Sequence, residues 1–216
     1  MKRAITLGIQ SVRTNLVPMV VLWLMATALV VGYYHVGAVV AVLEPLVRWQ
    51  ATSGWVAAFM NRVVFCGLLP GVFLLSVRSI RPPRPWLTVF VYSLWGGLWG
   101  IACDCFFTLQ TTWFGTGTDV TTIAKKVLVD QLVWNVFICT PPNALFFPWV
   151  ARDFQMERFR GMCTFLMDVC LTMLVSNWIV WIPVMVVNYV FPLPLQIQLV
   201  GLASAFWMLV ALRIVK

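Results

Sequence analysis

The sequence contains few charged residues. Lys, Arg, Asp and Glu together make up 10% of the 216 residues, whereas soluble domains carry about 25%. Hydrophobic residues make up 62% of the chain, which is more apolar surface than a soluble fold of this length could cover. The composition therefore excludes an ordinary soluble domain and predicts an integral membrane protein.

Ligands for a metal ion are also scarce. The chain has one histidine and no Cys-x-x-Cys pair, and no second cysteine cluster accompanies Cys103-Asp104-Cys105. The six cysteines lie in or beside apolar runs, where cysteine behaves as a small hydrophobe, so disulfides are not expected. Without a Ser-His-Asp set or a ligand cluster we expect no enzyme, no metal and no cofactor.

The net charge of +8 is spread between the apolar runs and does not form one patch. This distribution favours the lipid bilayer and anionic headgroups on its inner side as partners, and it argues against nucleic acid.

Apolar runs of the length that a spanning helix needs, about 20 residues, recur along the chain. They predict an all-α, polytopic transmembrane helical bundle of about six spans, at residues 16–40, 55–77, 86–109, 127–150, 163–190 and 195–212. Residues 81–85 cannot continue a helix because three of them are proline. Residues 114–119 form a loop in which Asp119 or Thr118 could cap the next helix.

Three parts follow from this division. Residues 1–15 form a basic N-terminal segment with apolar residues at helical spacing, which suits either an amphipathic helix on the membrane surface or an extension of the first span. Residues 16–80 hold two N-terminal spans, and residues 81–216 form a four-span unit. With a cytoplasmic N-terminus, the segments holding Lys2, Arg13, Arg84, Arg152 and Lys216 lie inside, so both termini are expected on the cytoplasmic side.

Ionisable residues inside spans are functional candidates by default. At 1.5 Å rise per residue, His35, Arg62, Asp104 and Asp130 all converge on the outer third of the membrane. Pairing of Arg62 with Asp104 or Asp130, or wetting from a cavity, would lower the cost of burying their charges. We therefore expect a polar cavity there, the alternative being side chains that reach out to the headgroups.

Amides extend this polar pattern. Gln131 and Asn135 are one turn apart in the fourth span, and Asn177, Trp181 and Asn188 share a face of the fifth. Such a row lines a pore or bonds a neighbouring helix. Gly96 and Gly100 predict close helix packing, whereas Pro141, Pro142 and Pro183 predict breaks or kinks.

From residue 86 to residue 212 the chain resembles the Mpv-seventeen/peroxisomal membrane protein family. The features that carry the likeness are, in order, Gly100 with Phe106-Phe107, Lys126 with Asp130-Gln131, Asn177-Trp178, Trp181, Asn188-Tyr189, Pro192 and Trp207. The chain departs from the family pattern at Ile101, Asp104, Val136, Met185 and Gln196, and Pro183 stands one position late.

The resemblance implies a membrane protein that forms or contributes to a weakly selective pore for small hydrophilic solutes. A homo-oligomer is a further expectation for its partners. The resemblance also implies the mitochondrial inner membrane or the peroxisomal membrane, beside the bacterial plasma membrane that the charge pattern allows. Two alternatives stay open: a structural or lipid-interacting membrane protein without conduction, and a proton-coupled transporter.

Overall fold

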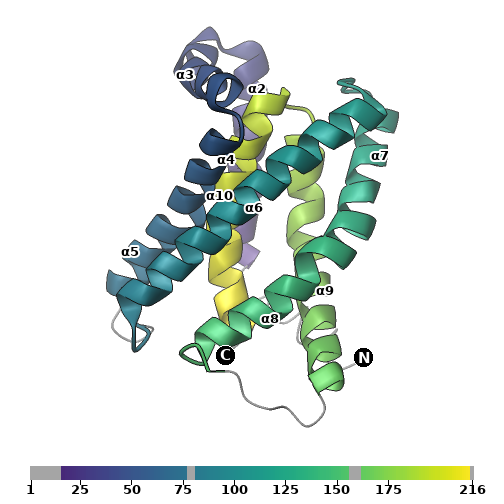
Figure 1. Cartoon of the computed structure of the whole chain (residues 1–216). Coiled ribbons are helices and arrows are strands. Elements are labelled where there is room, and N and C mark those ends of the chain that lie inside the picture. Colours follow the sequence, from purple (N-terminus) through teal and green to yellow (C-terminus); the bar gives the residue numbers. More distant parts are fainter. Residues whose placement is uncertain (1–15, 77–80, 156–161, 215–216) are drawn as a thin grey trace.

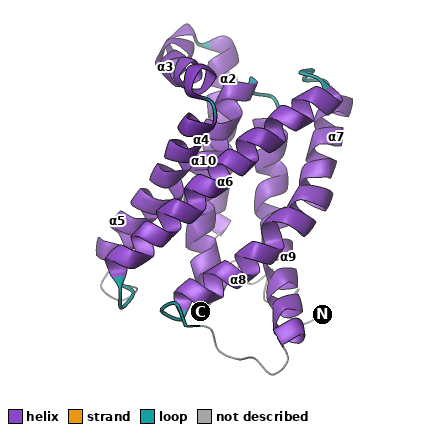
Figure 2. Cartoon of the chain, in the orientation of Figure 1, coloured by secondary structure: helices purple, strands orange, loops and turns teal. Residues whose placement is uncertain are grey.

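The chain forms a bundle of helices (Figure 1). The structure, a computed structural model, describes residues 16–76, 81–155 and 162–214. All regular elements in these ranges are helical, so the all-α prediction is confirmed (Figure 2). The amphipathic segment predicted at residues 1–15 lies outside the described residues.

The helices follow one another with short connections, and two π-helical segments, η1 and η3, each join two α-helices into one continuous rod. In chain order the elements are α2 (Leu16–His35), α3 (Gly37–Ser53), α4 (Trp55–Arg62), η1 (Val63–Leu68), α5 (Leu69–Ser76), α6 (Pro85–Phe114), α7 (Val120–Val129), η3 (Asp130–Cys139), α8 (Thr140–Ala151), α9 (Met162–Asn188) and α10 (Leu193–Ile214).

Three of the described helices are long and apolar enough to cross a membrane, namely Trp55–Ser76, Pro85–Phe114 and Met167–Asn188. The bent pair formed by α2 and α3 would make a fourth, and Leu193–Met208 is apolar but shorter. These helices support an integral membrane protein.

The first predicted span differs from the structure. The prediction of one helix through residue 40 is wrong, because α2 ends at His35 and Val36 is extended, with φ −127° and ψ 104°. The chain then turns by 103° into α3. Gly32 allows the close approach at this corner, since a Cβ there would lie 3.2 Å from the Val39 side chain. Apolar residues continue on both sides of the corner, so hydropathy alone does not reveal it.

α6 packs closely along α4 and η1 (Figure 1). At the expected glycines the backbones approach so closely that a Cβ on Gly96 would lie 2.6 Å from Cys66 Cβ. A Cβ on Gly100 would lie 2.8 Å from Arg62 Cγ and would collide with the Ala58 carbonyl. On its other side α6 meets η3 and α8 through ring stacking, Phe106 on Trp134 and Trp95 on Phe146, each with centroids 4.2 Å apart.

The prolines do not end their helices. Pro141 and Pro142 lie in the first turn of α8, directly after η3. At the position where the sequence predicts a break, the structure changes from π-helix to α-helix. α9 continues through Pro183 to Asn188. In the turn before Pro183, the Val180 carbonyl accepts a hydrogen bond from Trp23 Nε1 of α2 at 3.2 Å. Proline disturbs the hydrogen bonding of the preceding turn, and carbonyls near it commonly bind groups of neighbouring helices.

At one end of α6, the loop of residues 115–119 leads into α7. Asp119 is the N-cap of α7, as predicted, and its side chain accepts a hydrogen bond from the Thr122 backbone N–H at 3.0 Å. Hydrogen bonding to Thr122 holds the pKa of the Asp119 carboxyl below its ordinary value.

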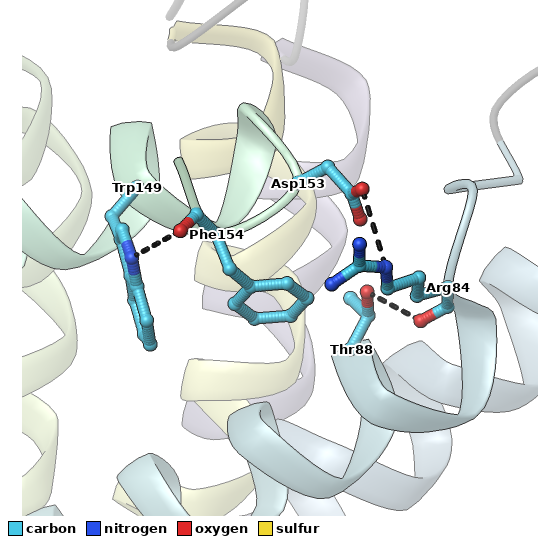
Figure 3. A network of polar contacts seen from close by, with 5 residues as sticks. All are labelled: Arg84, Thr88, Trp149, Asp153 and Phe154. Atoms are coloured by element: carbon cyan, nitrogen blue, oxygen red, sulfur yellow. Dashed lines mark hydrogen bonds and ion pairs between the residues drawn. The ribbon is translucent and has the colours of Figure 1, made fainter. Parts of the chain in front are cut away.

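At the other end, the turn after α8 meets the start of α6 (Figure 3). Asp153 and Phe154 both adopt positive φ, 56° and 65°, which is uncommon for residues other than glycine. The Phe154 carbonyl accepts from Trp149 Nε1 at 3.0 Å, and Arg84 Nε lies 3.4 Å from Asp153 Oδ2. The first contact closes the turn on α8, and the second joins the turn to the residue before α6.

Close packing at Gly100 predicts a measurable loss of stability when one methyl group is added. Gly100→Ala should lower the melting temperature of the detergent-solubilised protein, because overpacking against backbone costs about 1–3 kcal/mol. Gly37→Ala is the matched control, since a Cβ there has no neighbour within 4 Å and alanine is the better helix former. Equal losses for both variants would contradict this packing.

Candidate functional site

A cavity whose lining includes charged and amide side chains lies inside the bundle. It has a volume of about 120 Å³ and is lined by residues of α4, η1, α6, η3, α8, α9 and α10. Its polar lining consists of Arg62, Asp130, Gln131, Asn135, Thr140, Asn143, Asn177 and Ser204, and five tryptophans (Trp95, Trp99, Trp134, Trp181 and Trp207) contribute most of the aromatic lining. The cavity therefore combines both signs of charge, amides and aromatic rings.

The residues expected at a polar cavity fall into two groups. The larger group lines this cavity and consists of Arg62, Asp130, Gln131, Asn135, Asn177 and Trp181. Asp104 and Asn188 were expected with them but do not belong to the lining. Helical spacing assigns residues to a face of one helix, but it does not say which neighbour that face meets.

Arg62 is the cation of the cavity. Its side chain ends α4, directly before η1, and the residue is 6% exposed. The guanidinium donates to the hydroxyl of Ser204, and to the Sγ atoms of Cys103 at 3.3 Å and Cys66 at 3.7 Å. Its Nε is buried without a hydrogen-bond partner. The expected ion pairs with Asp104 and Asp130 do not form, since no carboxylate of the described residues lies within 4.0 Å of Arg62.

Asp130 is the anion of the cavity and the first residue of η3. Its Oδ1 accepts from Gln131 Nε2 at 2.8 Å, and its Oδ2 accepts from the Tyr189 hydroxyl at 2.7 Å. Both π-helical segments thus begin beside a buried ionisable residue, Arg62 before η1 and Asp130 in η3. π-Helical turns frequently occur at functional sites, and Arg62 and Asp130 both line the cavity.

Hydrogen bonds extend from Asp130 in two directions. Towards the end of α9, the Tyr189 hydroxyl accepts from Gln110 Nε2 at 2.7 Å. Along η3, Asn135 Nδ2 donates to Gln131 Oε1 at 3.3 Å. The chain ends in α8, where the Thr140 hydroxyl donates to Asn135 Oδ1 at 3.2 Å. A continuous polar chain therefore joins α6, α9, η3 and α8.

Tyr189 also belongs to a second hollow, which we call the α6–α7 recess. It has a volume of about 320 Å³ and is lined by Tyr33 and Tyr34 of α2, Thr111 of α6, the loop after α6, Lys126 and residues 189–193 and 196. The Lys126 Nζ lies 5.8 Å from the centroid of the Tyr189 ring, a cation–π contact. Tyr189 therefore faces the recess while its hydroxyl binds an aspartate of the cavity.

Asp104 and Asn188 have other surroundings. Asp104 Oδ1 accepts from Gln50 Nε2 of α3 at 2.9 Å, so this carboxylate holds α3 against α6. Asn188 is fully buried and neither of its amide atoms has a hydrogen-bond partner. His35 ends α2 at the corner with α3, and it is absent from the linings of both hollows.

The sequence did not predict several residues of the candidate site. Gln110, Lys126 and Tyr189 are buried in or beside the polar chain, although they lie near the ends of helices where polar residues are ordinary. Lys126 and Tyr189 are part of the family-like pattern, but the sequence did not predict that either would lie at a polar cavity. Ser204 is a single polar residue in an apolar run, and this pattern does not predict a functional role.

Comparisons of the chain with protein-family models, with curated proteins and with solved structures found no match.

Removing the Tyr189 hydroxyl should destabilise the protein. Tyr189→Phe withdraws a donor from the Asp130 carboxylate and an acceptor from Gln110, which we expect to cost about 1–2 kcal/mol. Tyr34→Phe is the matched control, because that hydroxyl is exposed and bonds only the Val190 carbonyl. Unfolding of both variants in detergent measures the difference, and an effect at Tyr189 no larger than at Tyr34 would count against a tight network.

Proposed function

We propose that the protein forms, or contributes to, a weakly selective pore for small hydrophilic solutes in a membrane. The observation that carries this proposal is the polar cavity inside apolar helices of membrane-spanning length. Polar side chains at membrane depth are costly and mark substrate or ion paths when they line a cavity.

A route for the solute follows from the two hollows. The α6–α7 recess contacts Tyr189, and Tyr189 binds Asp130 at the cavity. A solute would enter at the recess, pass the Tyr189–Asp130 pair and reach the row formed by Gln131, Asn135 and Asn177. The amides of that row would replace part of its hydration shell.

The membrane topology belongs to the same proposal. Six spans with both termini on the cytoplasmic side would use the bent α2–α3 pair and the rod from α7 through η3 to α8 as spans. The contact of Arg84 with the turn after α8 supports this arrangement, because it brings residues 81–85 and the turn containing Arg152 to one end. The likeness to the Mpv-seventeen/peroxisomal membrane protein family favours an organellar membrane, and the charge pattern equally suits a bacterial plasma membrane.

A scaffold without conduction is the main competitor. A scaffold would be expected to bond its polar groups within the bundle. Arg62 Nε and Trp99 Nε1 instead remain buried without partners, and both residues line the cavity. Unpartnered buried groups also occur outside the cavity, for example at Asn188 and Gln50, so it is solute leak, and not hydrogen bonding, that separates a path from a scaffold.

Ion preference tests the pore. In liposomes containing the purified protein, Asp130→Asn should raise the permeability ratio of chloride to potassium, because it removes the negative charge of the cavity while Arg62 remains. Asp104→Asn makes the same chemical change in a carboxylate outside the cavity and should leave the ratio unchanged. Reversal potentials under a salt gradient give the ratio.

Two results would contradict the pore. Liposomes that retain glycerol and salt as well as protein-free liposomes do would favour the scaffold. A shift for Asp104→Asn as large as the shift for Asp130→Asn would remove the cavity from the conduction path.

Proton-coupled transport is a second candidate, favoured by the buried Asp130 carboxylate and its bond to the Tyr189 hydroxyl. A proton carrier there would make solute uptake respond to an imposed pH gradient. Wild-type uptake should then rise with the gradient, and Asp130→Asn should abolish the response. Uptake insensitive to the gradient would exclude coupling and leave the simple pore.

A further inference from the structure

The cavity holds one cation and one anion that do not pair with each other. Arg62 comes from α4 and Asp130 from η3, and no ion pair joins them among the described residues. Both nevertheless line the same cavity. The two charges thus belong to one small space.

The Arg62 side of the cavity is built to receive an anion. The guanidinium donates only to neutral acceptors, one hydroxyl and two thiols. These bonds use three of the five N–H donors of a guanidinium, so donors remain for a ligand. A guanidinium fork matches the geometry of a carboxylate, and such charge-assisted bonds are about twice as strong as neutral ones.

The Asp130 side is built to receive a cation. Each carboxylate oxygen accepts one hydrogen bond from the protein, whereas an ionised carboxylate offers about four acceptor positions. Trp134 and Trp181 also line the cavity, and tryptophan is the aromatic ring that attracts an ammonium group best.

Volume limits the size of the ligand. The cavity measures about 120 Å³, and an engineered protein cavity of about 150 Å³ holds one benzene molecule. A solute of about five or six non-hydrogen atoms therefore fits.

We propose that the cavity binds a small zwitterion of the size of glycine or β-alanine, with its carboxylate at Arg62 and its ammonium group at Asp130. This inference rests on the proposed pore and names the class of solute that the pore favours. A simple anion would leave Asp130 uncompensated, a simple cation would do the same to Arg62, and a neutral polyol would satisfy neither charge. Electrostatic complementarity of this kind confers specificity.

Binding to the wild-type protein is the decisive measurement. The full chain is reconstituted in phosphatidylcholine nanodiscs, and radiolabelled glycine is titrated by a scintillation proximity assay. Unlabelled glycine or β-alanine should displace the label, whereas acetate, methylammonium and ethylene glycol should need concentrations at least about tenfold higher, because each satisfies at most one of the two charges.

Two variants test whether Arg62 and Asp130 each bind one charged end of the ligand. Arg62→Gln and Asp130→Asn should each weaken glycine binding at least about tenfold. Glu44→Gln is the control, since Glu44 forms an exposed pair with Arg48 and neither residue lines the cavity. Melting temperatures in the same nanodiscs show whether each variant is folded, and the wild-type displacement series does not depend on them.

The outcomes separate this inference from the pore. Displacement by acetate or by methylammonium at the same concentration as by glycine would overturn the zwitterion in favour of a single-charge site. No glycine binding, in a protein that still makes liposomes leak glycerol, would overturn the inference alone. Selective glycine binding without any solute leak would uphold the site and refute the pore.

Discussion

The burial of the Arg62 charge is the constraint on which the arrangement of the bundle depends. A guanidinium that is 6% exposed needs acceptors from every direction. The acceptors come from three elements: Cys66 of η1, Cys103 of α6 and Ser204 of α10. Cys103 can reach Arg62 because Gly100 lets the α6 backbone press against α4. The close helix packing and the polar cavity therefore share one cause, since the same glycine that tightens the bundle brings α6 to the charged side chain.

Asp130 imposes a second constraint on the other side of the cavity. Its carboxylate is bound by Gln131 of its own segment and by Tyr189, which directly follows α9. Through Gln110 and Thr140 the same hydrogen bonds reach α6 and α8. A network of this kind stabilises four elements relative to one another. It also places one tyrosine between the α6–α7 recess and the cavity, so the contact that stabilises the bundle lies on the route proposed for the solute.

Much of the site followed from the sequence, because charge and amide side chains are rare enough in apolar runs to stand out. Arg62, Asp130, Gln131, Asn135, Asn177 and Trp181 were all recognised in this way and all line one cavity. Asp104 stood out as clearly, yet it binds Gln50 of α3. The difference could not be predicted, because the 103° corner between α2 and α3 brings Gln50 to this end of α6. Gln110 and Tyr189 were missed for the opposite reason, since polar residues near helix ends usually face the headgroups.

By itself the sequence determined that the chain is helical, that its helices are apolar enough for a membrane, and that several polar side chains interrupt those apolar helices. These properties depend on composition and on local order along the chain, which hydropathy and proline placement express directly. Only the tertiary structure decided that Arg62 and Asp130 share a cavity without touching, that Asp104 lies apart, and that Pro141 and Pro142 follow a π-helical segment instead of ending a helix. Such outcomes depend on which helix faces meet, and contacts between residues far apart in sequence leave no periodic trace in either partner.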